Sequence, residues 1–132
     1  MRGKLEIKLG GEAYSLWFNN YATIEYTKRI LARFDGVTVK EKGKERNLTL
    51  IEAVEKLNEE NEFILLGEMI WAGICGNKHA KDIPYPLERQ KVFELVGVAD
   101  METLGEVSKA FFEAMGEGLE SEKTTKKKKS KN

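Results

Sequence analysis

The feature that most constrains the fold of this chain is the segment 63–75, which is apolar around almost every side of the helix it would form. Glu68 is its only charged residue. A helix that is hydrophobic all round belongs in the middle of a core, so the other elements must surround it. Gly67 and Gly73 would let those neighbours approach closely, at a cost of about 1 kcal/mol each in helix propensity.

A β-hairpin is predicted at residues 4–18. Apolar and polar residues alternate on both sides of Gly10-Gly11, which is the period of half-buried strands. The two glycines suit a tight turn, because both accept a positive φ.

A first helix is predicted after Asn19-Asn20, either of which can cap it, and Asp35-Gly36 ends it. Four apolar residues fall near one face of this helix, which we expect to be its core face: Tyr21, Ile24, Leu31 and Phe34.

Residues 37–47 are ambiguous. They begin with strand character and continue as a lysine-rich exposed loop, and the sequence does not assign their pairing.

Two helices are predicted in the middle of the chain. Thr49 and Glu52 form a capping box at the start of the first one, because each side chain can satisfy the other residue's backbone amide. Asn61 can cap the second helix, which contains the apolar segment, and Gly76 is expected to stop it.

Two further helices are predicted near the end. Pro86 suits the first turn of one helix, which Gly97 ends, and Asp100 caps the other. The last helix has one apolar stripe: Leu104, Val107, Phe111 and Met115. The fold class is therefore mainly α with a small N-terminal β-hairpin, as a compact bundle of about five helices. We expect one globular domain over residues 1–116 and a disordered lysine-rich tail over residues 117–132.

The formal net charge of zero conceals an asymmetry. Residues 121–132 contain six lysines and one acid, whereas residues 1–120 contain sixteen basic and twenty-one acidic residues. A nucleic-acid-binding protein usually concentrates its basic residues on a folded surface, so nucleic acid is not the expected partner.

The N-terminus has no long apolar run, and the segment 63–75 is too short to cross a bilayer, so we expect a cytoplasmic protein.

Metal and cofactor chemistry have little support in the sequence. Cys75 and His79 are four residues apart and would share a helical face, with Asp82 as a possible third ligand. Zinc requires three or four ligands, and the chain has no other Cys or His. We therefore interpret Cys75 as a core residue and His79 as a loop residue, and predict no metal ligand and no cofactor.

Catalytic chemistry is also not expected. No phosphate-binding loop or nucleophile elbow is present, and a triad would have to use the single histidine. Glu68 is the best candidate for a functional acid, because it interrupts the apolar helix. We favour the interpretation that it marks that helix's one solvated edge or pairs with a basic residue. We predict a non-catalytic protein without catalytic residues.

Three apolar residues are candidates for contact with a partner. Trp17 and Phe18 are adjacent in a strand and point to opposite faces, so one of them is expected to be exposed. Phe112 lies off the core stripe of the last helix, and Met115 lies at its end. We name Trp17, Phe112 and Met115 as protein-binding candidates, since aromatic residues and methionine are enriched at interfaces.

The order of these features resembles that of tail assembly chaperones from long-tailed phages, over roughly residues 4–116. The run Leu16–Glu25 (LWFNNYATIE) resembles their aromatic-asparagine step from a hairpin into the first helix. The run Ile70–Gly76 (IWAGICG) is similar to the end of their central apolar helix. A short final helix after an acidic cap is the third similarity, whereas residues 37–47 have no counterpart that we can align.

The resemblance implies a binding role in viral tail morphogenesis. Such chaperones coat the long tape-measure protein in the host bacterial cytoplasm until tail tube subunits polymerise around it, and they are absent from the mature virion. Many are also made in a longer form by ribosomal frameshifting, which helps to recruit tube subunits. Lys126–Lys129 would be encoded by A-rich codons, so we expect a slippery site there. We also expect self-association along the client, through the hairpin or the last helix.

Two other classes remain as alternatives. A small nucleic-acid-binding regulator would use the basic C-terminal tail, and its binding would be salt-sensitive and lost on deletion of residues 121–132. An enzyme subunit would show a concave pocket around His79 or Glu68, whereas an unrelated helical adaptor would not.

Overall fold

The computed structural model describes residues 3–115 of the chain. The predicted tail 117–132 and its lysines lie outside these residues. The elements in chain order are β1 (Lys4–Leu9), β2 (Glu12–Trp17), α1 (Asn20–Ala32), β3 (Thr38–Glu41), β4 (Lys44–Asn47), α2 (Leu50–Lys81), α3 (Arg89–Val96) and α4 (Met101–Ala114). The described part is therefore mainly helical with a small N-terminal hairpin, as predicted, but it contains four helices and not five.

The N-terminal hairpin forms where the alternation predicts it. β1 and β2 pair antiparallel with Leu9 opposite Glu12, and Gly10 and Gly11 both take positive φ between them. The buried face of the hairpin contributes Ile7, Leu9 and Leu16 to the core.

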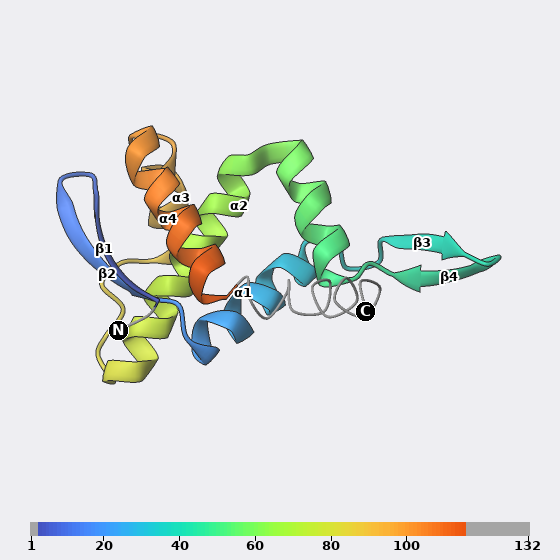
Figure 1. Ribbon diagram of the computed structural model, residues 1–132, viewed down its shortest axis with the longest axis horizontal. Helices are drawn as coiled ribbons and strands as arrows, with labels where there is room; N and C mark the ends of the chain where they lie inside the picture. The colour runs from blue at the N-terminus through green and yellow to red at the C-terminus, as the bar shows by residue number, and fades with distance from the viewer. Residues whose placement is uncertain (1–2, 116–132) are drawn as a thin grey trace, which may run out of the picture.

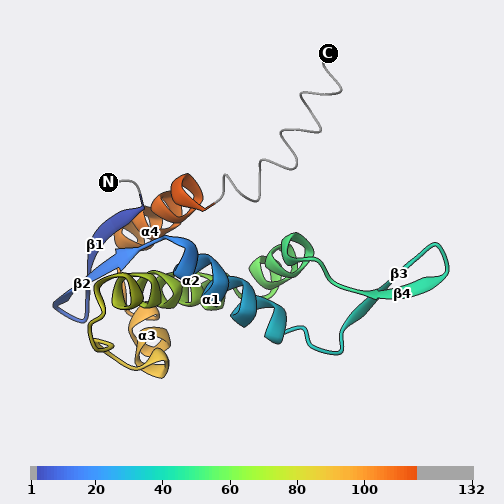
Figure 2. The same cartoon turned by 90° about the horizontal axis from the view of Figure 1, so that it is seen from below.

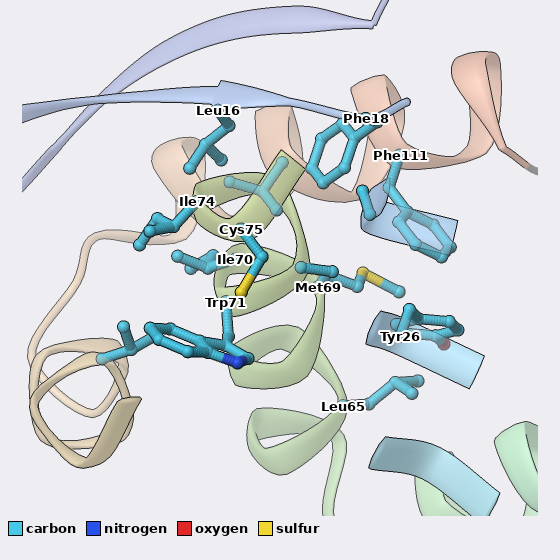
Figure 3. Close-up of a cluster of buried hydrophobic side chains, with 14 of the residues drawn as sticks. Leu16, Phe18, Tyr26, Leu65, Met69, Ile70, Trp71, Ile74, Cys75 and Phe111 are labelled. Atoms are coloured by element: carbon cyan, nitrogen blue, oxygen red, sulfur yellow. The ribbon is translucent and has the colours of Figure 1, made fainter. Parts of the chain in front are cut away.

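The second half of α2 lies at the centre of the molecule, with β2, α1, α3 and α4 packed against it (Figure 1). Every residue from 67 to 77 is buried, including Glu68. Figure 3 shows how side chains from the hairpin, α1 and α4 gather around this helix. Gly73 permits that approach, because a Cβ there would lie 2.8 Å from Leu16 Cβ and 2.9 Å from Phe18 Cε1.

The two helices predicted in the middle of the chain form the single element α2, which bends sharply at Asn61 (Figure 1). Asn61 leaves helical geometry (φ −164°, ψ 96°), and its side chain accepts a hydrogen bond from the Phe63 amide at 3.1 Å. The predicted cap is thus present, but no loop separates the two limbs, residues 50–60 and 62–81.

The predicted stop at Gly76 is wrong, since α2 continues to Lys81 and ends at Asp82 in the left-handed conformation. Gly76 serves close packing instead. A Cβ there would overlap the Trp17 carbonyl oxygen, and the Gly76 carbonyl accepts a hydrogen bond from Asn19 Nδ2 at 3.0 Å.

The predicted core face of α1 is also wrong in part. Tyr21, Ile24 and Leu31 are exposed, and only Phe34, just beyond the helix, is buried. The buried face is made by Ala22, Tyr26 and Ile30, which are spaced by four residues. The physical reason is the tight junction with Gly76, where the small Ala22 side chain fits and a larger one would not.

Residues 38–47 form a second hairpin that projects away from the other elements (Figures 1 and 2). Its register pairs Val39 with Arg46. Arg46 ties the hairpin to the start of α2, because its guanidinium donates to Glu52 Oε1 at 2.7 Å and Oε2 at 3.0 Å and also contacts Glu41.

The last two helices follow a connection without regular structure. Pro86 lies in a bend before α3 and not in its first turn, contrary to the prediction; Glu88 is the N-cap. In α4 the predicted stripe Leu104, Val107, Phe111 and Met115 is buried. Among residues 3–115, no helix is both long and apolar enough to cross a membrane.

Candidate functional site

One concave surface of the described residues that could hold a partner is a groove between the two limbs of α2 and one face of α4, here called the elbow groove. Its volume is about 400 Å³. Most of its lining is apolar: Val54, Phe63, Leu65, Leu66, Met69, Met101, Leu104 and Phe112. The polar lining consists of Glu55, Asn58, Glu62 and Ser108, beside Gly105.

Local sequence features explain why this groove is open. The break at Asn61 turns the two limbs of α2 away from a common axis, so that Val54 and Phe63 can both face the same space. On α4, Met101 and Phe112 are eleven residues apart, about three helical turns, and therefore share a face. Gly105 lies between them without a side chain and leaves open space above the helix, since a Cβ there would meet nothing within 4 Å.

Three apolar side chains of the groove are exposed to a degree that is unusual for their size. Met101 is 72% exposed, Phe112 46% and Phe63 45%. Scattered exposed apolar residues are common on proteins, but these three belong to one concave surface with a buried floor of Leu65 and Met69. A contiguous apolar surface of this kind is typical of a binding groove.

The structure separates the three residues that the sequence proposed as contacts. Phe112 lines the elbow groove. Trp17 lies on another surface, half-buried, with Lys4 Nζ 4.1 Å from the centre of its ring. Met115 is only 8% exposed and belongs to the core, so it offers little surface to a partner.

Sequence reasoning missed Phe63 and Met101 as groove residues. Phe63 falls in the apolar segment that the sequence predicts to be buried. Met101 directly follows a helix cap and lies outside the apolar stripe of its helix. A usable signal existed on α4, because Met101 and Phe112 together mark a second apolar face beside the core stripe. The role of Phe63 has no such signal, since it depends on the direction in which α2 turns at Asn61.

Glu68 is buried and forms an ion-paired cluster with two arginines. Its Oε2 atom accepts from Arg33 Nε at 3.0 Å and from Arg89 Nη2 at 2.7 Å. Both guanidinium groups also lie over the Phe93 ring, 5.7 Å and 5.0 Å from its centre. Of the readings left open by the sequence, pairing with basic residues is therefore the one observed. The cluster joins the end of α1, α2 and the start of α3.

A second cluster is aromatic and lies along the C-terminal part of α2, beginning one turn after Glu68. Trp71 Nε1 donates to Glu25 Oε2 at 2.8 Å, and Tyr85 stacks on the Trp71 ring with centres 5.2 Å apart. His79, on α2 and not in a loop, stacks on Tyr21. Burial raises the pKa of the Glu25 carboxyl, but hydrogen bonds from Arg29 and Trp71 outweigh it, and the pKa is lowered overall. These contacts attach the segment after α2 to α1.

Cys75 is buried, and burial raises the pKa of its thiol to about 12, so the thiol stays protonated at neutral pH. Cys75 and His79 do not come together with Asp82 as a metal site. Within residues 3–115, no group of three or more Cys, His, Asp or Glu side chains is arranged to hold a metal ion.

Comparison with known proteins identifies no relative. No protein-family model matches the chain, and neither a curated protein nor a solved structure is significantly similar to it. The functional argument therefore depends on the geometry of the elbow groove and on the sequence resemblance described above.

Proposed function

We propose that this protein is a non-catalytic tail assembly chaperone of a long-tailed phage, and that it binds the tape-measure protein through the elbow groove. The observation that carries the proposal is the groove itself, an exposed apolar surface with Met101, Phe112 and Phe63 at its rim. The family resemblance supplies the identity of the client.

The groove suits a helical client. An amphipathic helix can place its apolar face into a hydrophobic groove between helices, where residues one turn apart on one side of the client act as anchors. A tape-measure protein is a long helical chain that offers many such segments in a row. Weak binding at each segment is sufficient, because many copies on one client act together, and weak contacts permit later release to the tube.

The proposal includes no bond-making step. The carboxylate best placed for acid–base chemistry, Glu68, is held between two guanidinium groups, and the one thiol is protonated and buried. Ion pairing of this kind suits a structural role.

We further propose that the protein acts in the host cytoplasm and does not remain in the mature virion.

Recruitment of the tail tube protein is proposed to occur through a longer form. Lys126–Lys129, where a frameshift is expected, lie outside the described residues. The coding sequence tests this part directly. A slippery heptamer over these codons with an overlapping reading frame supports it, whereas AAG codons without an overlapping frame would reject it.

Co-expression with the tape-measure protein encoded in the same genome tests client binding. Phe112→Ala should reduce co-purification by about tenfold, because loss of an interface anchor that contributes about 1.4 kcal/mol weakens binding by that factor. Val98→Ala is the matched control, since Val98 is 77% exposed and lies outside the groove. Equal recovery of both variants would reject the groove as the client site. Trp17→Ala tests the hairpin surface in the same assay.

A further inference from the structure

The ion-paired cluster around Glu68 carries more positive charge than the buried carboxylate requires. The Glu68 side chain is fully buried, and one guanidinium group is enough to balance its charge. The structure places two there, from Arg33 at the end of α1 and from Arg89 at the start of α3. One carboxylate between two guanidinium groups leaves an excess of one positive charge.

Most N–H donors of these two arginines have no acceptor in the protein. A guanidinium group has five donors. Glu68 accepts from Arg33 through Nε, and from Arg89 through Nε and Nη2. Within residues 3–115, both terminal nitrogens of Arg33 and the Nη1 atom of Arg89 make no hydrogen bond. The Phe93 ring attracts both groups without taking up a donor.

The two arginines reach the surface and are at the same time held in place. Both side chains are 31% exposed, although each is anchored to a buried carboxylate. Because both groups donate to the same oxygen atom, Glu68 Oε2, their free nitrogens belong to one small surface. A ligand bound there would immobilise little that is not already fixed, which lowers the entropic cost of binding.

No ion pair in the described part of the chain neutralises the excess charge. Asp35 and Glu88 are the acidic residues closest in sequence to Arg33 and Arg89; both are exposed, and neither is ion-paired among residues 3–115. Arg29, one turn before Arg33 on α1, is balanced by Glu25 at 2.7 Å. The excess charge is therefore available to an anion.

We propose that the free nitrogens of Arg33 and Arg89 form an oxyanion site that binds a phosphate group in preference to a carboxylate. A planar carboxylate is satisfied by one guanidinium fork, whereas a phosphate group offers three acceptor oxygens and more than one negative charge, so it can accept from both arginines at once. Neither arginine lines the elbow groove, so the inference does not depend on the proposed function.

NMR titration of the isotope-labelled full chain with inorganic phosphate, at constant ionic strength, tests the inference. The Nε–Hε signals of Arg33 and Arg89 should shift together and saturate with a Kd on the order of 1 mM, as expected for two charge-assisted contacts. Acetate should bind about tenfold more weakly, because it engages one fork and not two.

Methyl phosphate distinguishes two sources of the phosphate group. Binding as tight as that of inorganic phosphate would support a phosphate monoester as the ligand. Exclusion of methyl phosphate, with inorganic phosphate still bound, would support the free ion.

Two variants separate the site from the general charge of the protein. Arg33→Lys keeps the charge but removes the fork, and should weaken phosphate binding by about tenfold. Arg46→Lys is the matched control, because the donors of Arg46 are already directed to Glu41 and Glu52, and it should leave the affinity unchanged. Circular dichroism verifies folding, and the wild-type titration decides the question alone if Arg33→Lys does not fold.

Three results would overturn the inference. Signals that shift linearly and equally at Arg29, Arg33, Arg46 and Arg89 would show charge screening and no site. Acetate that binds as tightly as phosphate would contradict the preference for a tetrahedral anion. Unchanged phosphate affinity in a folded Arg33→Lys variant would show that the arginine fork is not used. The proposed client groove stands or falls separately, on the recovery of the Phe112→Ala variant.

Discussion

At the scale of single residues, Glu68 shows how a charge can be accommodated in an otherwise apolar core. Its side chain is fully buried, and the side chains of both partner arginines are about one-third exposed. The pairs therefore keep part of the hydration of the arginines while satisfying the carboxylate. A buried ion pair adds little net stability over an apolar replacement, but loss of one partner is costly.

Replacement of Glu68 by alanine should lower the free energy of unfolding by about 3 kcal/mol, because two guanidinium groups lose their partner and a cavity is left. Urea denaturation measures the change. Lys91→Gln is the control, since the Lys91–Glu94 pair is solvent-exposed and should contribute less than about 1 kcal/mol. Similar small losses for both variants would show that the cluster is not structurally important.

Two glycines in helices should respond oppositely to alanine. Gly73→Ala should destabilise by about 1–3 kcal/mol, because the new Cβ meets Leu16 and Phe18 at less than 3 Å. Gly105→Ala should stabilise by up to about 1 kcal/mol, since its Cβ meets nothing and alanine favours the helix. Thermal unfolding of both variants tests the pair, and a stable Gly73→Ala would contradict the packing.

Local features of single residues were the most predictable from sequence. Asn19, Thr49 and Asp100 cap their helices as expected, because their side-chain oxygens accept hydrogen bonds from the backbone amides of Ala22, Glu52 and Thr103. A cap depends on a few adjacent residues only. The core face of α1 was mispredicted, since the choice of Tyr26 over Tyr21 depends on which side packs against Gly76, more than fifty residues away.

At the scale of elements, the start of α2 organises the projecting hairpin. Glu52 completes the capping box and at the same time accepts hydrogen bonds from Arg46 on β4. Hydrogen bonds from Arg46 and from the Thr49 amide lower the pKa of Glu52 to about 2. One carboxylate therefore couples a helix cap to the anchoring of β3 and β4.

The coupling gives a pH-dependent prediction. The pKa of Glu52 is lower in the folded state than its ordinary value of 4.5, so its stabilising effect is present above pH 4.5 and is lost as the pH falls toward 2. The difference in unfolding free energy between the wild type and Glu52→Gln should be constant near neutral pH and shrink progressively as the pH falls from 4.5 toward 2. A difference that persists unchanged at pH 2 would contradict the role of the charge.

Element boundaries were less predictable than element types. The hairpin at residues 4–18 and the buried central helix follow from hydrophobic periodicity. The pairing of residues 38–47 did not, because only Val39 and Arg46 in that hairpin are partly buried, and the strands have no apolar alternation to reveal it. The joining of two predicted helices at Asn61 was missed because a cap signal indicates where a helix starts and not how it meets the preceding one.

At the scale of the whole molecule, the elbow groove is a tertiary feature. It needs both limbs of α2 and α4 in place, and these come from segments about fifty residues apart in sequence. The sequence identified Phe112 as an apolar residue off the core stripe, but it could not predict that Phe63 and Met101 would join it. Only the bend at Asn61 brings these side chains to one surface.

The function assigned to this groove requires that binding and stability be separable. Phe112→Ala should reduce client binding by about tenfold while lowering the free energy of unfolding by less than about 1 kcal/mol, because the ring is 46% exposed. Parallel binding and denaturation measurements on the same preparation test this. Loss of binding that merely follows loss of folding would argue that Phe112 is a structural residue.

Hydrogen exchange of the full chain, alone and in complex with the tape-measure protein, tests the central claim most directly. Binding at the elbow groove should slow amide exchange in residues 54–69 and 101–112, while the β3–β4 hairpin and the Trp71–Tyr85 region remain unchanged. Protection confined to either of those two regions, or none in the groove segments of a stable complex, would contradict the account.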